Sequence, residues 1–139
     1  LCAKENSKNI TAWVKSRNMG FYTIEYSYRI HNHQKQREFN PDFFIKCEIE
    51  DEIIYLVVEI KDDGDDSTEN KAKYKYGKIH FFKLNEKLRT MDKKERYIFH
   101  FLSPRGFSAF FEYLNDGRLF VSQDNFRCDL ENLLEAESE

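Results

Sequence analysis

Two carboxylates and a lysine stand at the ends of two apolar segments of this sequence. Asp42 opens the segment 41–45, and Glu59 and Lys61 close the segment that begins at Ile53. Because side chains alternate along a strand, Glu59 and Lys61 share one face. The run from Ile53 to Val58 is apolar at every position, which predicts a strand buried on both faces. Charges at the end of such a strand are costly unless they have partners or a function.

These residue types favour chemistry on a phosphodiester. Asp42 and Glu59 offer the hard oxygen ligands that Mg²⁺ or Mn²⁺ prefers in proteins. A metal held in this way polarises a phosphodiester and lowers the pKa of a bound water, and Lys61 would orient that water or neutralise the developing charge. Pro-Asp alone is typical of a turn, and Glu-x-Lys alone of a solvated strand edge. Their combination on two neighbouring strands, joined by the polar turn 50–52, is far more specific.

The combination of Pro41-Asp42 with Glu59-Ile60-Lys61 resembles the PD-(D/E)xK nuclease signature. Three further segments resemble the C-terminal endonuclease domain of the restriction (Res) subunit of type III restriction–modification enzymes. These segments are NITAWVK at 9–15, FNPDF at 39–43 and YIFHFLSP at 97–104. The resemblance spans nearly the whole chain, and the three charged positions are its most specific part.

The resemblance implies a divalent-metal-dependent endonuclease that acts on double-stranded DNA and has a restriction-endonuclease-like fold. Asp42 and Glu59 would bind Mg²⁺ or Mn²⁺, and the Ile60 carbonyl would complete the metal site. Lys61 would act on the attacking water molecule. The implied partners are a helicase-like motor domain, which alone would use ATP, and a modification (methyltransferase) subunit that carries sequence recognition. The alternative is a DNA-docking or interaction module of the same fold whose site is unused. The intact set of three residues favours the enzyme.

Length and composition indicate one folded domain. The chain has 139 residues, enough for a core, and we expect a single domain over 1–139. Because the chain begins with Leu1, we expect it to belong to a longer protein, and the resemblance implies that this protein contains a helicase. An aromatic content of 16% argues against disorder. No apolar run reaches the roughly 20 residues of a membrane helix, and no secretory signal is visible. Cys2, Cys47 and Cys128 are odd in number and lack a Cys-x-x-Cys pair, which favours reduced thiols in a cytoplasmic protein.

The charge balance predicts weak DNA affinity for the chain by itself. The net charge is −3, but the stretch from Asp129 onward holds five acids and no base. The preceding 128 residues therefore carry 22 basic and 20 acidic side chains, which is not the balance of a strongly basic module.

The first half of the sequence predicts a helix followed by an antiparallel meander that ends at Lys61. The apolar spacing of Ile10, Trp13 and Val14 favours a helix over 8–17, with Ser7 as its cap and Gly20 beyond its end. Alternation over 21–30 predicts a half-buried strand, and a polar turn over 32–36 returns the chain to the Pro41-Asp42 strand. Glu25 is either a further metal-site carboxylate or, as we favour, an exposed strand residue.

The stretch after Lys61 predicts an acidic loop and a long helix. The loop 62–66 is favoured as solvated, with recruitment of a second cation as the alternative. Asp66 and Glu69 resemble a capping box that starts a helix near Ser67, which runs to about Leu88. We expect 72, 76, 79 and 83 to share one side of it. Lys71, Lys75 and Lys78 form a basic stripe that either holds DNA phosphates or is simply solvated, and Gly77 indicates close backbone packing or a break.

The C-terminal half completes an α/β domain with a central mixed sheet flanked by helices. An apolar strand over 97–102 after the long helix predicts a parallel right-handed crossover, with His100 as a core histidine. Ser103-Pro104 starts a helix that carries an apolar face of phenylalanines and ends at Gly117. The segment 119–121 is a candidate edge strand. Leu130, Leu133 and Leu134 predict a short amphipathic helix.

Overall fold

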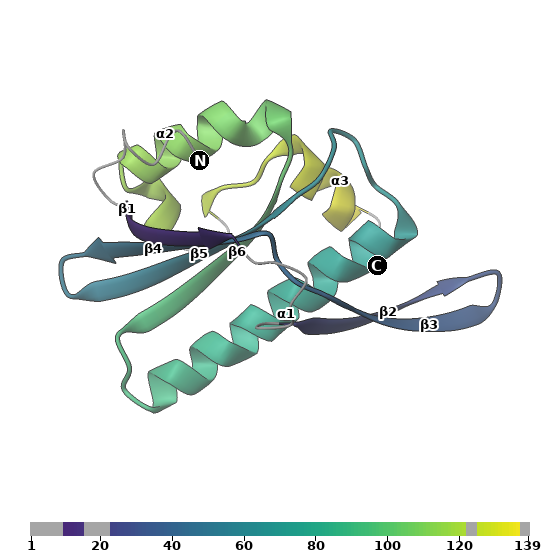
Figure 1. The fold of residues 1–139 in the computed structure, drawn as a ribbon, viewed down its shortest axis with the longest axis horizontal. Helices are drawn as coiled ribbons and strands as arrows, with labels where there is room; N and C mark the ends of the chain where they lie inside the picture. Colours follow the sequence, from purple (N-terminus) through teal and green to yellow (C-terminus); the bar gives the residue numbers. More distant parts are fainter. Residues whose placement is uncertain (1–9, 16–22, 122–124, 137–139) are drawn as a thin grey trace.

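A four-stranded mixed sheet forms the centre of this computed structural model, which describes residues 10–15, 23–121 and 125–136 (Figure 1). Its strand order is β1-β4-β5-β6, and the bounds are Ile10–Lys15 for β1, Phe43–Ile49 for β4, Glu52–Ile60 for β5 and Glu95–Leu102 for β6. β1, β4 and β5 pair antiparallel, whereas β5 and β6 pair parallel. The predicted mixed α/β architecture and its parallel crossover are therefore confirmed.

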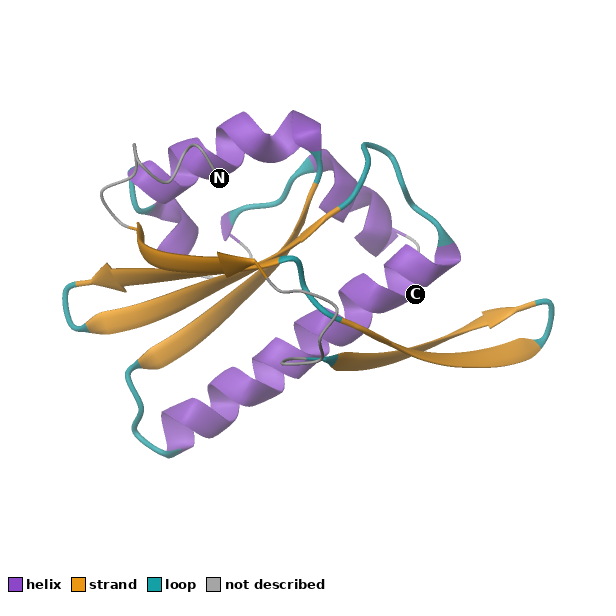
Figure 2. Ribbon diagram, in the orientation of Figure 1, coloured by secondary structure: helices purple, strands orange, loops and turns teal. Residues whose placement is uncertain are grey.

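Helices cover both faces of this sheet (Figure 2). The long helix α1, Thr68–Thr90, follows β5 and packs its Phe81 ring on Phe99 of β6. The turn η2, Pro104–Gly106, leads from β6 into α2, Phe107–Asn115, which packs on the other face. The C-terminal helix α3, Asp129–Ala136, packs against β6 and α1. Both the long helix and the C-terminal helix were predicted, the first to within two residues of its ends.

A separate two-stranded ribbon stands beside the sheet. It consists of β2, Ile24–Ile30, and β3, His33–Phe39, joined by a turn at His31 and Asn32. Both turn residues have positive φ, as a two-residue hairpin requires. The polar turn predicted over 32–36 is therefore shorter than expected, and β3 already begins at His33.

The predicted meander is wrong at its middle step. β2 with β3 and β4 with β5 pair antiparallel as expected, but within the described residues β2 and β3 do not hydrogen-bond to the main sheet. The predicted helix over 8–17 is also wrong over its described part, since residues 10–15 form strand β1. Ile10, Thr11, Trp13 and Val14 are β-branched or aromatic and favour a strand when an edge is available, and here the edge of β4 is available. Ser7 and Gly20 lie outside the described residues.

Two smaller expectations also change. The candidate edge strand over 119–121 is instead a 3₁₀ turn, η3, Arg118–Phe120, which follows Gly117 in the left-handed conformation. The buried side of α1 is formed by Asn70, Tyr74, Gly77 and Phe81 rather than by the predicted positions, and Ile79 is exposed. Aromatic rings on β6 select this side, because a Cβ at Gly77 would lie 2.4 Å from the Phe99 ring. Gly77 thus marks close packing within an unbroken helix.

Candidate active site

The pairing of β4 with β5 brings Asp42 and Glu59 to the same end of the sheet. Phe43 pairs with Val58, and both side chains face α2, where they line a small apolar cavity. Because side chains alternate, Asp42 and Glu59 each fall on the opposite face, toward α1. The Ile60 backbone N–H donates a hydrogen bond of 2.8 Å to Oδ2 of Asp42, which ties the end of β5 to the residue preceding β4.

Glu59 is buried and incompletely partnered. Its exposed fraction is 5%, and its Oε2 atom lies 3.4 Å from Nζ of Lys61. Its Oε1 atom is buried and has no hydrogen-bond partner among the described residues. Burial, followed by the negative charge of Asp42, raises the pKa of Glu59 to about 7, although Lys61 and Lys73 oppose the shift. A buried carboxylate oxygen without a partner is costly, and a bound cation is one way to satisfy it.

Lys73 of α1 is a site residue that the sequence reasoning missed. Burial, followed by the positive charge of Lys61, lowers the pKa of Lys73, while Glu59 and Glu69 raise it. Its Nζ atom lies 5.7 Å from the ring centre of Tyr26 and 5.8 Å from that of Phe39. The sequence did contain a signal for Lys73. Glu69 and Lys73 are four residues apart on the predicted helix, a spacing at which two oppositely charged side chains lie next to each other on its surface.

Glu69 connects this cluster to the ribbon. The Tyr26 hydroxyl donates a hydrogen bond of 2.5 Å to Oε2 of Glu69, and burial together with that carboxylate raises the pKa of Tyr26. The first turn of α1 is capped by Ser67, whose Oγ accepts from the Asn70 N–H, rather than by the predicted Asp66. The cluster thus takes its charged groups from β5, from the residue before β4 and from α1.

The predicted basic stripe lies on a different flank of α1 from Lys73. At 100° per residue, Lys71, Lys75 and Lys78 fall between 140° and 200° around the helix axis from Lys73, by the roughly 3.6-residue helical period. Lys78 forms an ion pair with Glu135 of α3 and lies 5.3 Å from the Tyr74 ring centre. Lys75 is exposed. The stripe is therefore separate from the candidate carboxylates, and its role in DNA binding stays a prediction.

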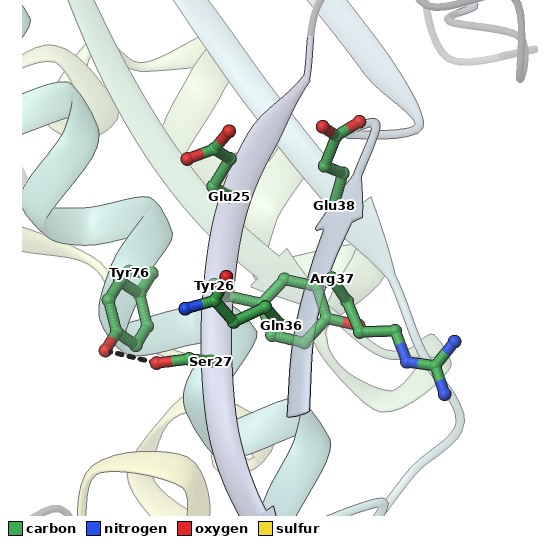
Figure 3. Close-up of a pocket in the computed structure, with 7 residues that line it drawn as sticks. All are labelled: Glu25, Tyr26, Ser27, Gln36, Arg37, Glu38 and Tyr76. Carbon is green, nitrogen blue, oxygen red and sulfur yellow. Dashed lines mark hydrogen bonds between the residues drawn. The ribbon is translucent and has the colours of Figure 1, made fainter. Parts of the chain in front are cut away.

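The remaining candidates fall into exposed or core positions. Glu25 is exposed and pairs across the ribbon with Glu38, and both line a surface hollow of ≈ 670 Å³ between the ribbon and Tyr76 (Figure 3). In the loop 62–66, Asp63 accepts a hydrogen bond from the Arg105 N–H. His100 is buried with Nδ1 2.8 Å from Oε2 of Glu131, whereas its Nε2 is buried without a hydrogen-bond partner among the described residues. These positions contribute no further carboxylate to Asp42 and Glu59.

No protein-family model, curated protein or solved structure matches this chain. The residues themselves therefore carry the functional conclusion. Within the described ranges, no group of three or more His, Cys, Asp or Glu side chains could hold a metal ion. A metal here would accordingly rest on two carboxylates, completed by backbone and solvent oxygens. Two hard carboxylates, one with a buried orphan oxygen, fit Mg²⁺ or Mn²⁺ in this way.

The helices of the described residues include none that is both long and apolar enough to cross a membrane.

The two described cysteines, Cys47 and Cys128, are buried free thiols, and burial raises the pKa of Cys47 to about 12. Neither thiol belongs to the Glu59 cluster.

Proposed function

We propose that this chain is a divalent-metal-dependent DNA endonuclease domain with a restriction-endonuclease-like fold, the cleavage module of a type III restriction enzyme. The observation that carries the proposal is the unpartnered Oε1 of Glu59, held in a buried position beside Asp42 and Lys61. A structural carboxylate at the end of a buried strand would be expected to have both oxygens paired. One that keeps an open oxygen beside a second carboxylate suits a cation-binding role.

The residues take distinct roles in this proposal. Asp42 and Glu59 would hold Mg²⁺ or Mn²⁺, with the Ile60 carbonyl as a further ligand. The bound metal supplies a polarised phosphate and a water of lowered pKa. The Ile60 N–H fixes Oδ2 of Asp42, so that the carboxylate is oriented before any ligand arrives. Lys61 and Lys73 present two ammonium groups to the same small region, which suits an anionic substrate such as a DNA phosphate.

Further parts of the proposed enzyme lie on other chains or domains. We propose that a helicase-like motor domain consumes ATP and delivers double-stranded DNA to this site, and that a methyltransferase subunit selects the sequence. The near-balance of basic and acidic residues is consistent with a cleavage module that depends on such partners for affinity.

The test is DNA cleavage by the enzyme that contains this domain together with its motor. We expect Mn²⁺-dependent or Mg²⁺-dependent cleavage to be lost in Asp42→Asn and in Glu59→Gln, while ATP hydrolysis continues. Glu25→Gln is the matched control, because Glu25 is an exposed carboxylate outside the cluster. Parental cleavage by Asp42→Asn would contradict the proposal. DNA binding without cleavage by the unmodified enzyme would favour the alternative, a docking module of the same fold.

A further inference from the structure

The β2–β3 ribbon projects away from the rest of the molecule (Figure 1). Its base is anchored by Ile24, Tyr26 and Phe39, which are buried in the core. Its distal part is not covered, since every residue from His33 to Glu38 is exposed and Ile30 at the tip is 41% exposed. Six residues of an extended strand are roughly 20 Å long, so the exposed stretch from His33 to Glu38 forms an extended arm.

Charge is segregated along this arm. The distal half, residues 28–36, contains Arg29, Lys35 and two histidines but no acidic residue. Arg29 pairs across the ribbon with Gln34, and Lys35 with Tyr28, so no carboxylate lies opposite either cation. The two acidic residues, Glu25 and Glu38, pair with each other near the base. The arm therefore offers a polyanion a cationic tip.

The side chains of the tip suit a nucleic acid groove. A two-stranded β-ribbon fits the major groove of B-DNA, and arginine and glutamine are the side chains that reach base edges there. Arg29, Gln34 and Gln36 are exposed and fall on one face of the ribbon, by the register that pairs Arg29 with Gln34. Lys35 falls on the other face, where it can meet a phosphate.

We propose that the β2–β3 ribbon inserts its distal half into the major groove of duplex DNA. The inference rests on the proposed function for its choice of duplex DNA, and it adds a contact surface that is distinct from the metal-site residues and from the α1 stripe. The contact relies on charge complementarity between the acid-free tip and the DNA phosphates.

The ribbon is joined directly to the candidate active site. Phe39 at the end of β3 is followed by Asn40, Pro41 and then Asp42. At the base of the ribbon, Tyr26 donates its hydrogen bond to Glu69, and Phe39 packs beside Lys73. Because the base of the ribbon is anchored to α1, a duplex bound at the tip would be held in a fixed position relative to Asp42. This makes the ribbon a positioning element for the substrate rather than part of the chemistry.

The test is a binding titration of this chain with a 30-base-pair fluorescent duplex in EDTA, so that no cleavage occurs. We expect Arg29→Ala with Lys35→Ala to weaken binding at least about fivefold and to lower the salt-dependence slope by about one unit, for the phosphate that Lys35 no longer neutralises. Lys93→Ala with Lys94→Ala is the matched control, because it removes the same charge from an exposed turn between α1 and β6. The control should bind within about twofold of the parent. Circular dichroism and the thermal midpoint check that both variants are folded.

Two results of this titration would overturn the proposal. One is an unchanged affinity and slope for Arg29→Ala with Lys35→Ala. The other is an equal weakening in the control, which would assign the effect to net charge alone. A major-groove competitor such as methyl green should displace the chain, and a minor-groove binder such as distamycin should not; the reverse pattern would also contradict it.

The outcome is separable from that of the proposed function. Binding in EDTA needs no metal, so the titration with the ribbon variants does not depend on whether Asp42 and Glu59 hold a cation. Tight ribbon-dependent binding without cleavage by the complete enzyme would remove the nuclease proposal and leave the ribbon proposal standing. Cleavage that is unaffected by Arg29→Ala with Lys35→Ala would remove the ribbon proposal and leave the nuclease proposal standing.

Discussion

Nζ of Lys61 lies 3.4 Å from Oε2 of Glu59. Glu59 precedes Lys61 by two residues, and the two side chains lie on the same face of the chain. The ion pair leaves the other oxygen of Glu59 buried and, among the described residues, unpartnered. Lys61 therefore compensates the charge of Glu59 at one carboxylate oxygen and leaves the other oxygen without a partner among those residues. One oxygen of the Glu59 carboxylate is thus paired with an ammonium group, while the other has no hydrogen-bond partner in the described part of the chain.

The first prediction concerns Lys61. If its ammonium acts mainly on the charge that develops in the transition state, Lys61→Ala should lower the cleavage rate by roughly 10²–10³, should lower DNA affinity far less, and should leave ATP hydrolysis unchanged. Single-turnover cleavage by the complete enzyme measures this rate. A Mn²⁺ titration separates the variants, because Glu59→Ala should lose metal binding and Lys61→Ala should keep it. Lys46→Ala, at a lysine paired with Glu48 on β4, is the control. Cleavage by Lys61→Ala at the parental rate would refute this role.

The second prediction concerns the pH dependence of stability. Burial and Asp42 raise the pKa of Glu59 from 4.5 to about 7 in the folded state. The stability that this group contributes is present below pH 4.5 and is lost as pH rises toward 7, because the folded state binds the proton more tightly than the unfolded state. In EDTA, Glu59→Gln should therefore gain about 1–3 kcal/mol relative to the parent between about pH 4.5 and pH 8. Urea unfolding at both pH values measures the difference. A pH-independent difference would mean that Glu59 is not desolvated in solution.

The third prediction concerns Gly77. A Cβ at this position would lie 2.4 Å from the fully buried Phe99 ring. Gly77→Ala should therefore lower the free energy of unfolding by about 1–3 kcal/mol through overpacking, despite a gain of about 1 kcal/mol in helix propensity. Urea unfolding at neutral pH tests this. Lys75→Ala, at an exposed position of the same helix, should stay within about 0.5 kcal/mol of the parent. A more stable Gly77→Ala would show that the Phe99 ring can move aside.

The fourth prediction concerns the basic stripe on α1. Lys71→Ala, Lys75→Ala and Lys78→Ala together should weaken DNA binding and lower its salt slope by about one unit for each phosphate that is no longer neutralised. Because Lys78 is paired with Glu135, Lys78→Ala alone should change the slope less than Lys75→Ala alone. Titrations between 50 and 200 mM salt, roughly the range over which such contacts are screened, would measure both. Identical slopes for the triple variant and the parent would assign the stripe to solvent.

The sequence by itself determined the existence of the elements that have a strong local signal. The continuous apolar run of β5, the long helix after Ser67 and the crossover to β6 were all predictable, because an uninterrupted apolar run and a helix cap are local features. The sequence also placed Glu59 and Lys61 on one face, since alternation along an extended chain needs no tertiary information.

Tertiary structure decided what depends on which partner is available. Residues 10–15 have a helical apolar spacing, yet they form β1 because β4 offers an open edge. The ribbon stands apart from the main sheet because Tyr26 and Phe39 pack on α1 and β6 instead of continuing the ladder. Lys73 reaches Glu59 and Lys61 only because Gly77 lets α1 lie close on the Phe99 ring, which sets the rotation of the helix about its axis. Long-range packing of this kind brings together residues whose proximity cannot be predicted from the hydrophobic period of a single strand or helix.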